Sequence, residues 1–553
     1  MVKQAIKVIS LGGVGEVGKN STVVQYGKDM VLVDAGVMFP EEQMLGVDLV
    51  IPDFSYVRQN VDRLRAVLLT HGHEDHIGAV PYLLQTLGRR IPIYGSTLTL
   101  GLLKAKLEEF RVTKLADLQT VESGRAYRFG TLEAEFVPVS HSVPDARAIV
   151  VDSPAGAIVM TGDFKLDETP ALGAATEMDR LREIGNRGIL ALLSDCVRVE
   201  QPGRTPSERV VAEALEMIIR EARGRVILTT FASNITRLEQ VTRIASMFGR
   251  KVAVIGRSME DSVKVAQELD YLRPPVGTIV SLREIRGLPQ NRVLLLAAGS
   301  QGEPTSALAR IAAGDHPQIK IVPGDTVIVS ATPVPGNEET VAKTIDNLFR
   351  RGAVVLYRDV APNVHVSGHA SRDELKDMIG LIKPKFCVPL HGEYRHMVLY
   401  QVLAGETGIP PERVILAEIG DVVELTSESA RKKGRVPSGS VLVDGLTLGV
   451  TQTVLRERGK LAEDGILIAA VAVDRETGRI LGGPDILSRG FVYRDEEDLF
   501  KRGRAQVLRA VKRQLKGEAE YGFIVGKIKD VLGKFIYEQT RLQPLILPVV
   551  TEV

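Results

Sequence analysis

The feature that most constrains this chain is the hexapeptide His71-Gly-His73-Glu-Asp75-His76, which follows the apolar run 66–70. It holds three of the nine histidines of the chain, together with a carboxylate. Zinc and borderline ions such as manganese bind neutral imidazole nitrogen and carboxylate oxygen. Because side chains alternate along an extended segment, His71 and His73 can share one ion, which leaves Asp75 and His76 for another. A loop of solvated histidines is the alternative, but it gives no physical reason for this concentration of ligands.

Three later strand ends offer further metal ligands. His141 ends the run PVSH, Asp163 ends MTGD, and His391 ends VPLH. Taken singly, each has an ordinary structural interpretation: His141 could cap a turn, Asp163 could accept from a backbone amide, and His391 could pack in a core. Together with the hexapeptide they complete a set for two metal ions, in which the carboxylate of Asp163 suits the bridging position.

Composition limits the class of protein without identifying a substrate. With 553 residues, 44% of them hydrophobic and 25% charged, the chain has the profile of a soluble protein of two to four domains. No apolar run approaches the roughly 20 residues that span a bilayer, and the N-terminus lacks the pattern of a signal peptide. Only Cys196 and Cys387 are present, which favours a reducing compartment and predicts a cytoplasmic protein. A net charge of +1 means that a nucleic-acid substrate would need a local basic groove.

The pattern of strands and helices predicts a mixed α/β fold in which one domain interrupts another. Short strands with glycine-rich turns fill 1–206, alternating helices and buried strands fill 207–361, and short strands return over 362–450. A linker is predicted over 451–462 and a last domain over 463–553, with an apparent hairpin at 466–483. The polar, basic, turn-rich stretch 428–440 is predicted to be exposed.

Gly13, Gly15 and Gly18 form a GxGxxG pattern, and Asp34 lies where a ribose-binding acid would sit. A dinucleotide site needs a helix directly after the glycines, because the helix N-terminus holds the pyrophosphate. The intervening residues look instead like strand, turn and strand. We therefore interpret the pattern as a glycine-rich loop beside an active site.

The ligand order HxHxDH, then one His, one Asp and a late His, is similar to that of the metallo-β-lactamase superfamily. This resemblance implies an αββα sandwich. It also implies that one ion is held by His71, His73 and His141, and the other by Asp75, His76 and His391, with Asp163 bridging them. Asp34 would support these ligands from behind, although an ordinary strand-end turn is the alternative for that residue.

The domain inserted at 207–361 resembles the β-CASP insert of the nucleases in that superfamily. Matches to their additional motifs are Asp195 in LLSDC and His369 in HVSGH. The implied role of His369 is to protonate the departing 3′ oxygen, with Asp195 fixing and charging the imidazole. A buried polar contact between domains is the alternative for this pair.

Over essentially its full length the chain resembles the bacterial ribonuclease J family. The segments that carry the resemblance are LGGVGEVGKNS, LTHGHEDHIGA, PVSHSVPD, TGDFK, GSQGEP, ATPVPGNE, HVSGHAS and PLHGEYRH. The chain departs from the family at SDCVRVE, where members often have a small-polar run such as SDSTNAE. That departure puts contacts from Cys196 and Val197 in doubt, while Asp195 is retained.

The resemblance implies a ribonuclease that uses a hydroxide activated by two divalent ions, with Zn²⁺ expected and Mn²⁺ as the alternative. It implies 5′-to-3′ exonuclease action from 5′-monophosphate ends and endonuclease cuts, in RNA maturation and decay. It also implies a small α/β C-terminal domain linked to self-association as a dimer or tetramer, a place in an RNA-degradation complex, and no membrane association. The implied substrate-binding residues are Ala232, Ser233, Asn234, Ser300, His365, Val366, Ser367, Gly368 and His369. Ordinary turn chemistry is the alternative for these loops.

Two further groups of charged residues have both a functional and an ordinary interpretation. By the same resemblance, Asp48 and Asp444 would hold a structural cation such as Ca²⁺, and the alternative is that they are surface carboxylates. The basic cluster Arg431, Lys432, Lys433 and Arg435 could contact the RNA backbone, although runs of charge are more often only solvated.

Two other functional classes stay open at this point. A thioester or lactam hydrolase could use the same metal ligands, but it has no use for an insert of about 150 residues, Asp195 or His369. A regulatory paralogue that binds RNA without cutting it would be expected to lack ligands, and all seven are present.

Overall fold

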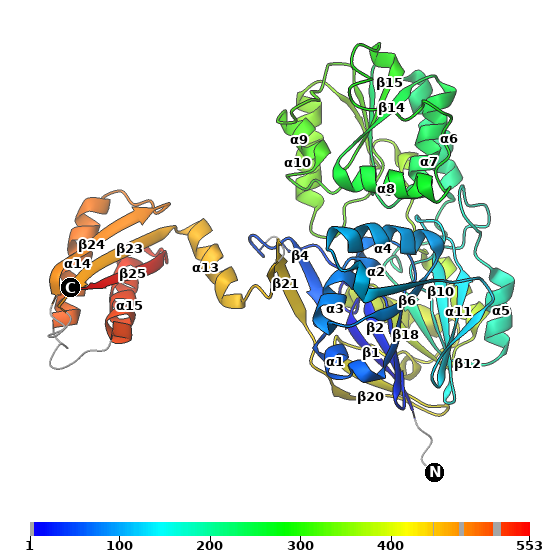
Figure 1. Ribbon diagram of the computed structural model, residues 1–553, viewed down its shortest axis with the longest axis horizontal. Helices are drawn as coiled ribbons and strands as arrows, with labels where there is room; N and C mark the ends of the chain where they lie inside the picture. The colour runs from blue at the N-terminus through cyan, green and yellow to red at the C-terminus, as the bar shows by residue number, and fades with distance from the viewer. Residues whose placement is uncertain (1–4, 42, 446, 475–479, 513–520) are drawn as a thin grey trace. The chain divides into compact units, whose positions relative to one another are not determined.

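The structure, a computed structural model, describes residues 5–41, 43–445, 447–474, 480–512 and 521–553. The chain forms two compact units. One comprises the chain up to Phe39 together with Val50–Val441, and the other comprises Pro40–Leu49 with Leu442–Val553. Figure 1 shows the elements of each unit.

The first unit contains a sandwich of two sheets. The eight-stranded sheet has the order β20-β19-β1-β2-β3-β5-β6-β7 and the six-stranded sheet the order β18-β12-β11-β10-β9-β8. The first sheet consists of β1 (Ile6–Gly12), β2 (Ser21–Tyr26), β3 (Asp29–Val33), β5 (Leu64–Leu68), β6 (Ile91–Gly95), β7 (Ala116–Thr120), β19 (Asp421–Leu425) and β20 (Ala430–Arg435). The second consists of β8 (Ala126–Phe129), β9 (Leu132–Pro138), β10 (Arg147–Ser153), β11 (Gly156–Met160), β12 (Ile189–Asp195) and β18 (Phe386–Leu390).

Apolar side chains of both sheets form one core, with Val8, Val24 and Leu68 from the first sheet and Phe136 and Val150 from the second. Helices cover the outer faces. They are α3 (Val80–Leu87) and α4 (Thr97–Glu109) beside the first sheet, and α5 (Met178–Asn186), α11 (Arg372–Ile382) and α12 (Tyr394–Glu406) beside the second. Shorter pieces are α1 (Ser55–Gln59), α2 (Glu74–Ile77) and β4 (Leu49–Pro52). The predicted αββα arrangement is confirmed.

The strand register explains why distant loops meet at one edge of the sandwich. Strands β3 and β5 are parallel, with Val33 opposite Leu68, and β12 and β18 are parallel, with Asp195 opposite Leu390. Parallel neighbours bring their carboxyl ends to the same edge, so the loops after these strands lie together. The segments that follow them carry Asp34, the hexapeptide and His391.

The inserted domain has a five-stranded parallel sheet in the order β14-β15-β13-β16-β17. Its strands are β13 (Val226–Thr229), β14 (Lys251–Ile255), β15 (Val293–Ala297), β16 (Thr326–Val329) and β17 (Val354–Leu356). One face packs on α6 (Glu208–Glu221), α7 (Ile235–Met247) and α8 (Arg257–Glu268), and the other on α9 (Ala307–Ala313) and α10 (Glu338–Arg350). Helices on both faces explain the nearly continuous apolar runs of these strands, as predicted.

The second unit has a three-stranded sheet in the order β24-β23-β25, covered by two helices. Its elements are α13 (Gln452–Glu463), β23 (Ile466–Val473), β24 (Ile480–Arg489), α14 (Glu496–Lys512), α15 (Tyr521–Thr540) and β25 (Leu545–Glu552), with the short pair β21 (Ser440–Asp444) and β22 (Thr447–Leu448) before them. The predicted hairpin pairs as β23 and β24, and residues 475–479 of its turn lie outside the described residues. The segment predicted as a linker forms α13, which Thr451 caps by accepting from the amide of Val454.

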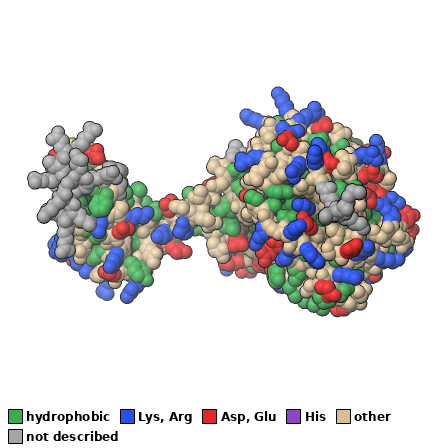
Figure 2. Space-filling view, turned by 90° about the horizontal axis from the view of Figure 1, so that it is seen from below, with side chains coloured by type: hydrophobic (Ala, Val, Ile, Leu, Met, Phe, Trp, Pro, Cys, Tyr) green, Lys and Arg blue, Asp and Glu red, His purple; other side chains and the backbone are tan. Residues whose placement is uncertain are grey.

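Two surface features bear on function. Basic and acidic side chains occur together across the face shown in Figure 2. The basic cluster Arg431–Arg435 is exposed, as predicted, but it forms edge strand β20 paired with β19. Among the described helices, none has an apolar stretch long enough to cross a membrane.

Candidate metal centre

The hexapeptide leaves β5 and runs into the short helix α2, and its histidines converge with His141 on one point. The Nε2 atoms of His71 and His141 each lie 3.1 Å from Nδ1 of His73. Oδ2 of Asp163 lies 3.6 Å from Nε2 of His71 and 3.7 Å from Nε2 of His141. Ligand nitrogens about 3.3 Å apart are what a tetrahedral ion with bonds of about 2.0 Å would produce.

A second cluster shares the same carboxylate. Oδ2 of Asp163 lies 3.2 Å from Nε2 of His76 and 3.8 Å from Nε2 of His391, and Oδ2 of Asp75 lies 3.5 Å from Nε2 of His76. Within each of the two clusters, the possible ligand atoms lie within 4.8 Å of one another. The structure therefore brings together all seven predicted metal ligands, divided between two clusters as predicted.

The protonation of the first cluster suits metal binding. Burial lowers the pKa of His73 to about 4, and burial with the neighbouring imidazoles holds the pKa of His71 and His141 well below the usual value. These rings are therefore neutral near pH 7, and a neutral imidazole is the form that binds a metal ion. Oδ1 of Asp163 is buried and has no hydrogen-bond partner within the described part of the chain, which is costly unless a cation or water satisfies it.

The second cluster contains an excess of negative charge. Burial lowers the pKa of His76, but the carboxylates of Asp163, Asp75 and Asp34 outweigh it and hold this pKa well above the usual value. Conversely, burial raises the pKa of Asp163, and the imidazoles of His391 and His76 hold it well below the usual range. Three carboxylates around one imidazole indicate a place for a cation, so the residues present fit a divalent metal site.

The residues behind the ligands fix their orientation. Asp34 accepts hydrogen bonds from the amide and hydroxyl of Thr70, both at 2.8 Å, and its Oδ2 lies 2.7 Å from Nδ1 of His76. The carbonyl oxygen of Gly368 lies 2.7 Å from Nδ1 of His141. A Cβ on Gly368 would lie 2.6 Å from the ring of His141, so only glycine fits at this position. Such contacts select the ring nitrogen that faces the metal.

Asn20 and Thr70 were missed by the sequence reasoning. The Asn20 side chain lies 3.0 Å from Nε2 of His76 and 2.7 Å from Nδ1 of His391. Its neighbours are the three glycines with positive φ of the GxGxxG loop, which joins β1 to β2 without a helix. The loop lies at the site as predicted, since the His391 amide donates to the carbonyl of Gly13 at 2.6 Å. The asparagine within the segment GGVGEVGKNS was the available signal.

Asp195 and His369 form a hydrogen-bonded pair beside the clusters. Oδ2 of Asp195 lies 2.8 Å from Nδ1 of His369, which is 3.9 Å from Oδ2 of Asp163. Burial lowers the pKa of His369, but the carboxylates of Asp195 and Asp163 outweigh it and raise this pKa to about 9. His369 is thus protonated near pH 7, as a general acid must be.

The predicted substrate-binding residues lie on loops of the same unit. The Ser367 hydroxyl accepts from the His369 amide at 3.1 Å, and Nδ1 of His365 is buried without a hydrogen-bond partner. The side chain of Asn234 caps α7 by accepting from the amide of Arg237 at 3.0 Å. Val366 packs in the core of the inserted domain, Ser300 is buried, and Ala232 and Ser233 are half-buried.

The remaining predicted site residues have ordinary surface partners. Asp48 accepts from the amide of Gly445 at 2.6 Å, and Asp444 pairs with Arg458. In the basic cluster, three of the four side chains pair with acidic residues: Lys432 with Asp421, Lys433 with Glu424, and Arg435 with Glu418 and Asp421. Most of that charge is therefore neutralised by the protein itself.

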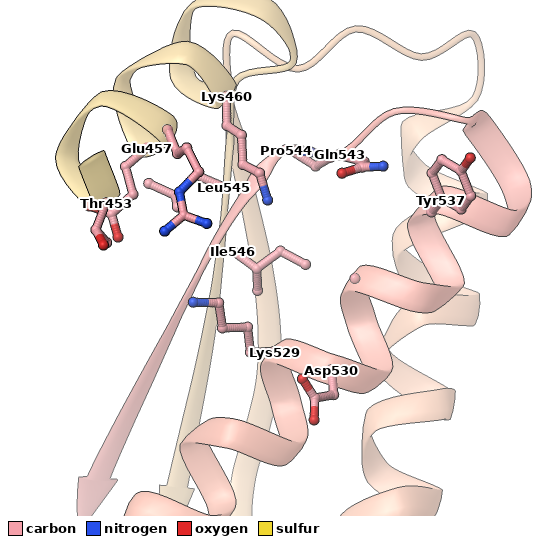
Figure 3. A pocket seen from close by; sticks show the side chains of 12 residues that line it. Thr453, Glu457, Lys460, Lys529, Asp530, Tyr537, Gln543, Pro544, Leu545 and Ile546 are labelled. Atoms are coloured by element: carbon pink, nitrogen blue, oxygen red, sulfur yellow. The ribbon is translucent and has the colours of Figure 1, made fainter. Parts of the chain in front are cut away.

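The C-terminal unit has a separate groove of about 470 Å³ between α13, α15 and the start of β25 (Figure 3). Arg456, Lys460 and Lys529 face it together with Glu457 and Asp530, and all five side chains are exposed. Mixed, solvated charges of this kind do not by themselves define a ligand, and none of the predicted site residues lines the groove.

Four family models match consecutive parts of the chain. They are the metallo-beta-lactamase superfamily over residues 14–212, the ribonuclease J beta-CASP domain over 223–348, the Zn-dependent metallo-hydrolase RNA specificity domain over 354–414, and the ribonuclease J C-terminal domain over 453–553.

Named relatives cover nearly the whole chain. Ribonuclease J2 of Bacillus subtilis (strain 168) is 41% identical over 99% of this chain and 99% of its own length. Ribonuclease J 1 of Streptococcus pyogenes serotype M3 is 43% identical over 99% of this chain and 97% of its own. A crystal structure of a protein of unknown function from Enterococcus faecalis V583 shares the fold, with a TM-score of 0.51 and 16% identity over 76% of this chain and 100% of that one. The chain belongs to the ribonuclease J family, whose members are metal-dependent ribonucleases.

Proposed function

We propose that this chain hydrolyses RNA phosphodiester bonds with two divalent metal ions, as a 5′-to-3′ exonuclease that prefers 5′-monophosphate ends and also cuts internally, in RNA maturation and decay. The observation that supports this most directly is the pair of ligand clusters that share Asp163, with the charged His369 3.9 Å from the shared carboxylate. Two adjacent cation sites beside a proton donor suit the displacement of an oxygen from phosphorus.

In this proposal one ion is held by His71, His73 and His141 and the other by Asp75, His76 and His391, with Asp163 between them. Zn²⁺ is the proposed ion because imidazole predominates among the ligands, and Mn²⁺ is the alternative that the same donors accept. When bound, the ions supply an activated water for attack on phosphorus and offset charge on the phosphoryl oxygens.

The proton for the departing 3′ oxygen comes from His369. Its Nδ1 is engaged by Asp195, which leaves Nε2 as the atom that can donate. Asp195 keeps the ring charged and fixes its rotation, so that the proton is available where the leaving oxygen develops negative charge. Asn20, Asp34 and Thr70 act only through the ligands they orient, and are positioning residues.

For the 5′-terminal phosphate we propose a pocket of hydroxyls, backbone amides and imidazole from the loops at 232–234, 300 and 365–369. Its members are Ala232, Ser233, Asn234, Ser300, His365, Val366, Ser367, Gly368 and His369. The unpartnered Nδ1 of His365 supports this, because a buried polar atom without a partner is expected to meet a ligand or water. A terminal monophosphate fits such a pocket, whereas a triphosphate adds charge and bulk.

We also propose the location, the assembly, a structural cation and the domain boundaries of the chain. The two cysteines are both free and buried, which agrees with a reducing, cytoplasmic location. Self-association as a dimer or tetramer, membership of an RNA-degradation complex and a structural Ca²⁺ at Asp48 and Asp444 follow from the family resemblance. The domain boundaries at 206, 361 and 450 follow from the sequence pattern of strands and helices.

The test is time-resolved digestion of one RNA bearing a 5′-monophosphate, 5′-triphosphate or 5′-hydroxyl, in Zn²⁺ or Mn²⁺, with a thioester panel in parallel. We expect mononucleotide release, fastest from the monophosphate, together with fragments from internal cuts. Equal rates from all three ends would refute the terminal-phosphate pocket. Thioester cleavage without RNA cleavage would refute the proposed function as a whole.

A further inference from the structure

Arg198 lies three residues beyond Asp195, in the turn after β12. Its Nε is buried and has no hydrogen-bond partner among the residues that the structure describes. Within the described part of the chain, its guanidinium takes part in no ion pair and no side-chain hydrogen bond. A half-buried, unpaired arginine beside a reaction centre is costly to the folded protein alone, and an anionic ligand would remove that cost.

The two carboxylates with an electrostatic effect on Arg198, those of Asp195 and Glu374, already accept hydrogen bonds from other groups. Asp195 binds His369 through Oδ2 and accepts from the amide of Val197 through Oδ1 at 3.0 Å. Glu374 accepts three backbone amides at 2.7–2.9 Å, those of Leu166, Thr205 and Ser371. Neither acid therefore has an oxygen free of hydrogen bonds to pair with the guanidinium.

A second arginine without an ion pair among the described residues, Arg358 of the inserted domain, has an electrostatic effect on Arg198. Arg358 is exposed in the loop between β17 and the HVSGH segment, and among the described residues it too forms no ion pair. Burial and the like charge of Arg358 lower the pKa of Arg198. Burial and the charges of Arg237, Arg358 and Arg198 lower the pKa of His365 to about 3, and among the described residues its buried Nδ1 has no hydrogen-bond partner. Arg198 and His365 lie on the two segments that are joined by the 2.8 Å contact between Asp195 and His369. An unpartnered guanidinium nitrogen and an unpartnered imidazole nitrogen on these two segments favour an anion with more than one oxygen.

We propose that Arg198 and Arg358 together bind a phosphate group of the RNA substrate, next to the Asp195–His369 pair. The proposal rests on the proposed function for the identity of the anion. Arginine suits it because the planar guanidinium donates two parallel hydrogen bonds to phosphate oxygens.

The test compares Arg198→Asn, Arg358→Asn and the double variant with the wild type, and Arg286→Asn serves as the matched control. Arg286 is an exposed arginine of the same unit, with no ion pair among the described residues. Arg198 is half-buried in a turn, and asparagine is a smaller polar side chain that turns accept, so the fold is expected to tolerate the substitution. Binding of a fluorescent single-stranded RNA is measured against salt concentration with a chelator present. The values of kcat and KM are measured with metal, on RNA with a 5′-monophosphate or a 5′-hydroxyl.

We expect Arg198→Asn to weaken RNA binding and raise KM about 10- to 100-fold, with kcat nearly unchanged, as for the removal of a charge-assisted hydrogen bond. The slope of log affinity against log salt should decrease by about 0.7 for each phosphate that the variant no longer neutralises. If KM rises only for the 5′-monophosphate substrate, the arginines contact the terminal phosphate. If KM rises equally for both substrates, they contact an internal phosphate. The control should behave as the wild type.

An unchanged salt slope and KM in Arg198→Asn would overturn the proposal. A fall in kcat with KM unchanged would also overturn it, since Arg198 would then act by positioning Asp195. Because binding is measured without metal, the two ideas fail separately. If the wild type cuts RNA and Arg198→Asn has the same salt slope as the wild type, only the arginine contact is refuted. If Arg198→Asn has a smaller salt slope but the wild type cuts no RNA, only the proposed function is refuted.

Discussion

Replacement of Asp195 by asparagine is the most informative perturbation of this site. The asparagine keeps the size of the side chain, and its amide oxygen can still accept from the amide of Val197. Its NH2 group would face Nδ1 of His369, in place of a carboxylate oxygen at 2.8 Å. The variant therefore removes one negative charge and one hydrogen-bond acceptor from the general acid without creating a cavity.

The size of the effect follows from the geometry of the pair. An opposite charge within about 4–6 Å typically changes a pKa by about 1–3 pH units, so the pKa of His369 should fall by that amount. From the value of about 9 that His369 has beside Asp195, a fall of about 2 would bring it to about 7. The protonated fraction at pH 8 would then drop from about 0.9 to about 0.1, while at pH 6 it would stay near 0.9.

The direction in which the pKa of His369 changes determines the pH range in which activity is lost. A general acid works only in its protonated form, so the rate falls as the pH rises through its pKa. Asp195→Asn should therefore move the basic limb of the pH–rate profile to lower pH, with about a tenfold loss at pH 8 and little at pH 6. Divalent ions bound at the proposed site would lower the pKa of His369 in both proteins, so the quantity to compare is the difference in pH between the basic limbs of the variant and the wild type.

The assay is single-turnover cleavage of 5′-labelled monophosphorylated RNA between pH 6 and 9.5 at saturating metal. Asp377→Asn is the control, because it removes a partly exposed carboxylate of α11 that pairs with Arg204 away from the proposed centre. His369→Ala should slow the chemical step by about 10²–10⁴-fold and leave RNA binding almost normal. Identical basic limbs in Asp195→Asn and wild type, or a uniform loss at every pH, would refute this account of the pair.

Three further predictions concern the metal ligands, the substrate end and the fold. His76→Ala should abolish cleavage and reduce the metal content found by elemental analysis while the circular dichroism spectrum stays native, because the site is local; turnover in metal-replete buffer would argue against a ligand role. A 5′-triphosphate RNA should be degraded more slowly than its monophosphate twin, and equal rates in a gel time course would contradict the terminal pocket. Arg237→Ala should destabilise the inserted domain by about 3–5 kcal/mol in urea unfolding, since Glu208, 2.7 Å away, would stay buried with, among the described residues, only the longer contact of 4.0 Å to Lys165. An unchanged unfolding midpoint would show that this pair contributes little.

Much of the metal chemistry could be predicted from local sequence. The hexapeptide, PVSH, MTGD and VPLH each place a ligand directly after an apolar strand, and both the residue type and the strand end can be read from a few neighbouring letters. The buried parallel strands of the insert were predictable for the same reason, because helices on both faces require apolar residues throughout. These features depend on contacts within a short segment.

Other features depend on residues far apart in sequence. Asn20 meets His391 only because β1 and the loop after β18 come together, and the carbonyl of Gly368 meets His141 only across the two parts of the sandwich. The local pattern around each residue is not specific to a metal site, since an asparagine after glycines and a glycine before a histidine are also common in turns. The same holds for the two unpaired arginines, whose charges become significant only once the nearby carboxylates are known to be engaged elsewhere.

The linear order of residues was thus enough to establish which chemical groups are available and that they stand at strand ends, because alternation and strand length are local properties. The grouping of six ligands around the shared carboxylate of Asp163, the charge on His369 and the unpaired charge of Arg198 depend on sheet register and burial. Register and burial arise when the whole chain packs, because distance and desolvation, which determine electrostatic free energies, have no counterpart in spacing along the sequence.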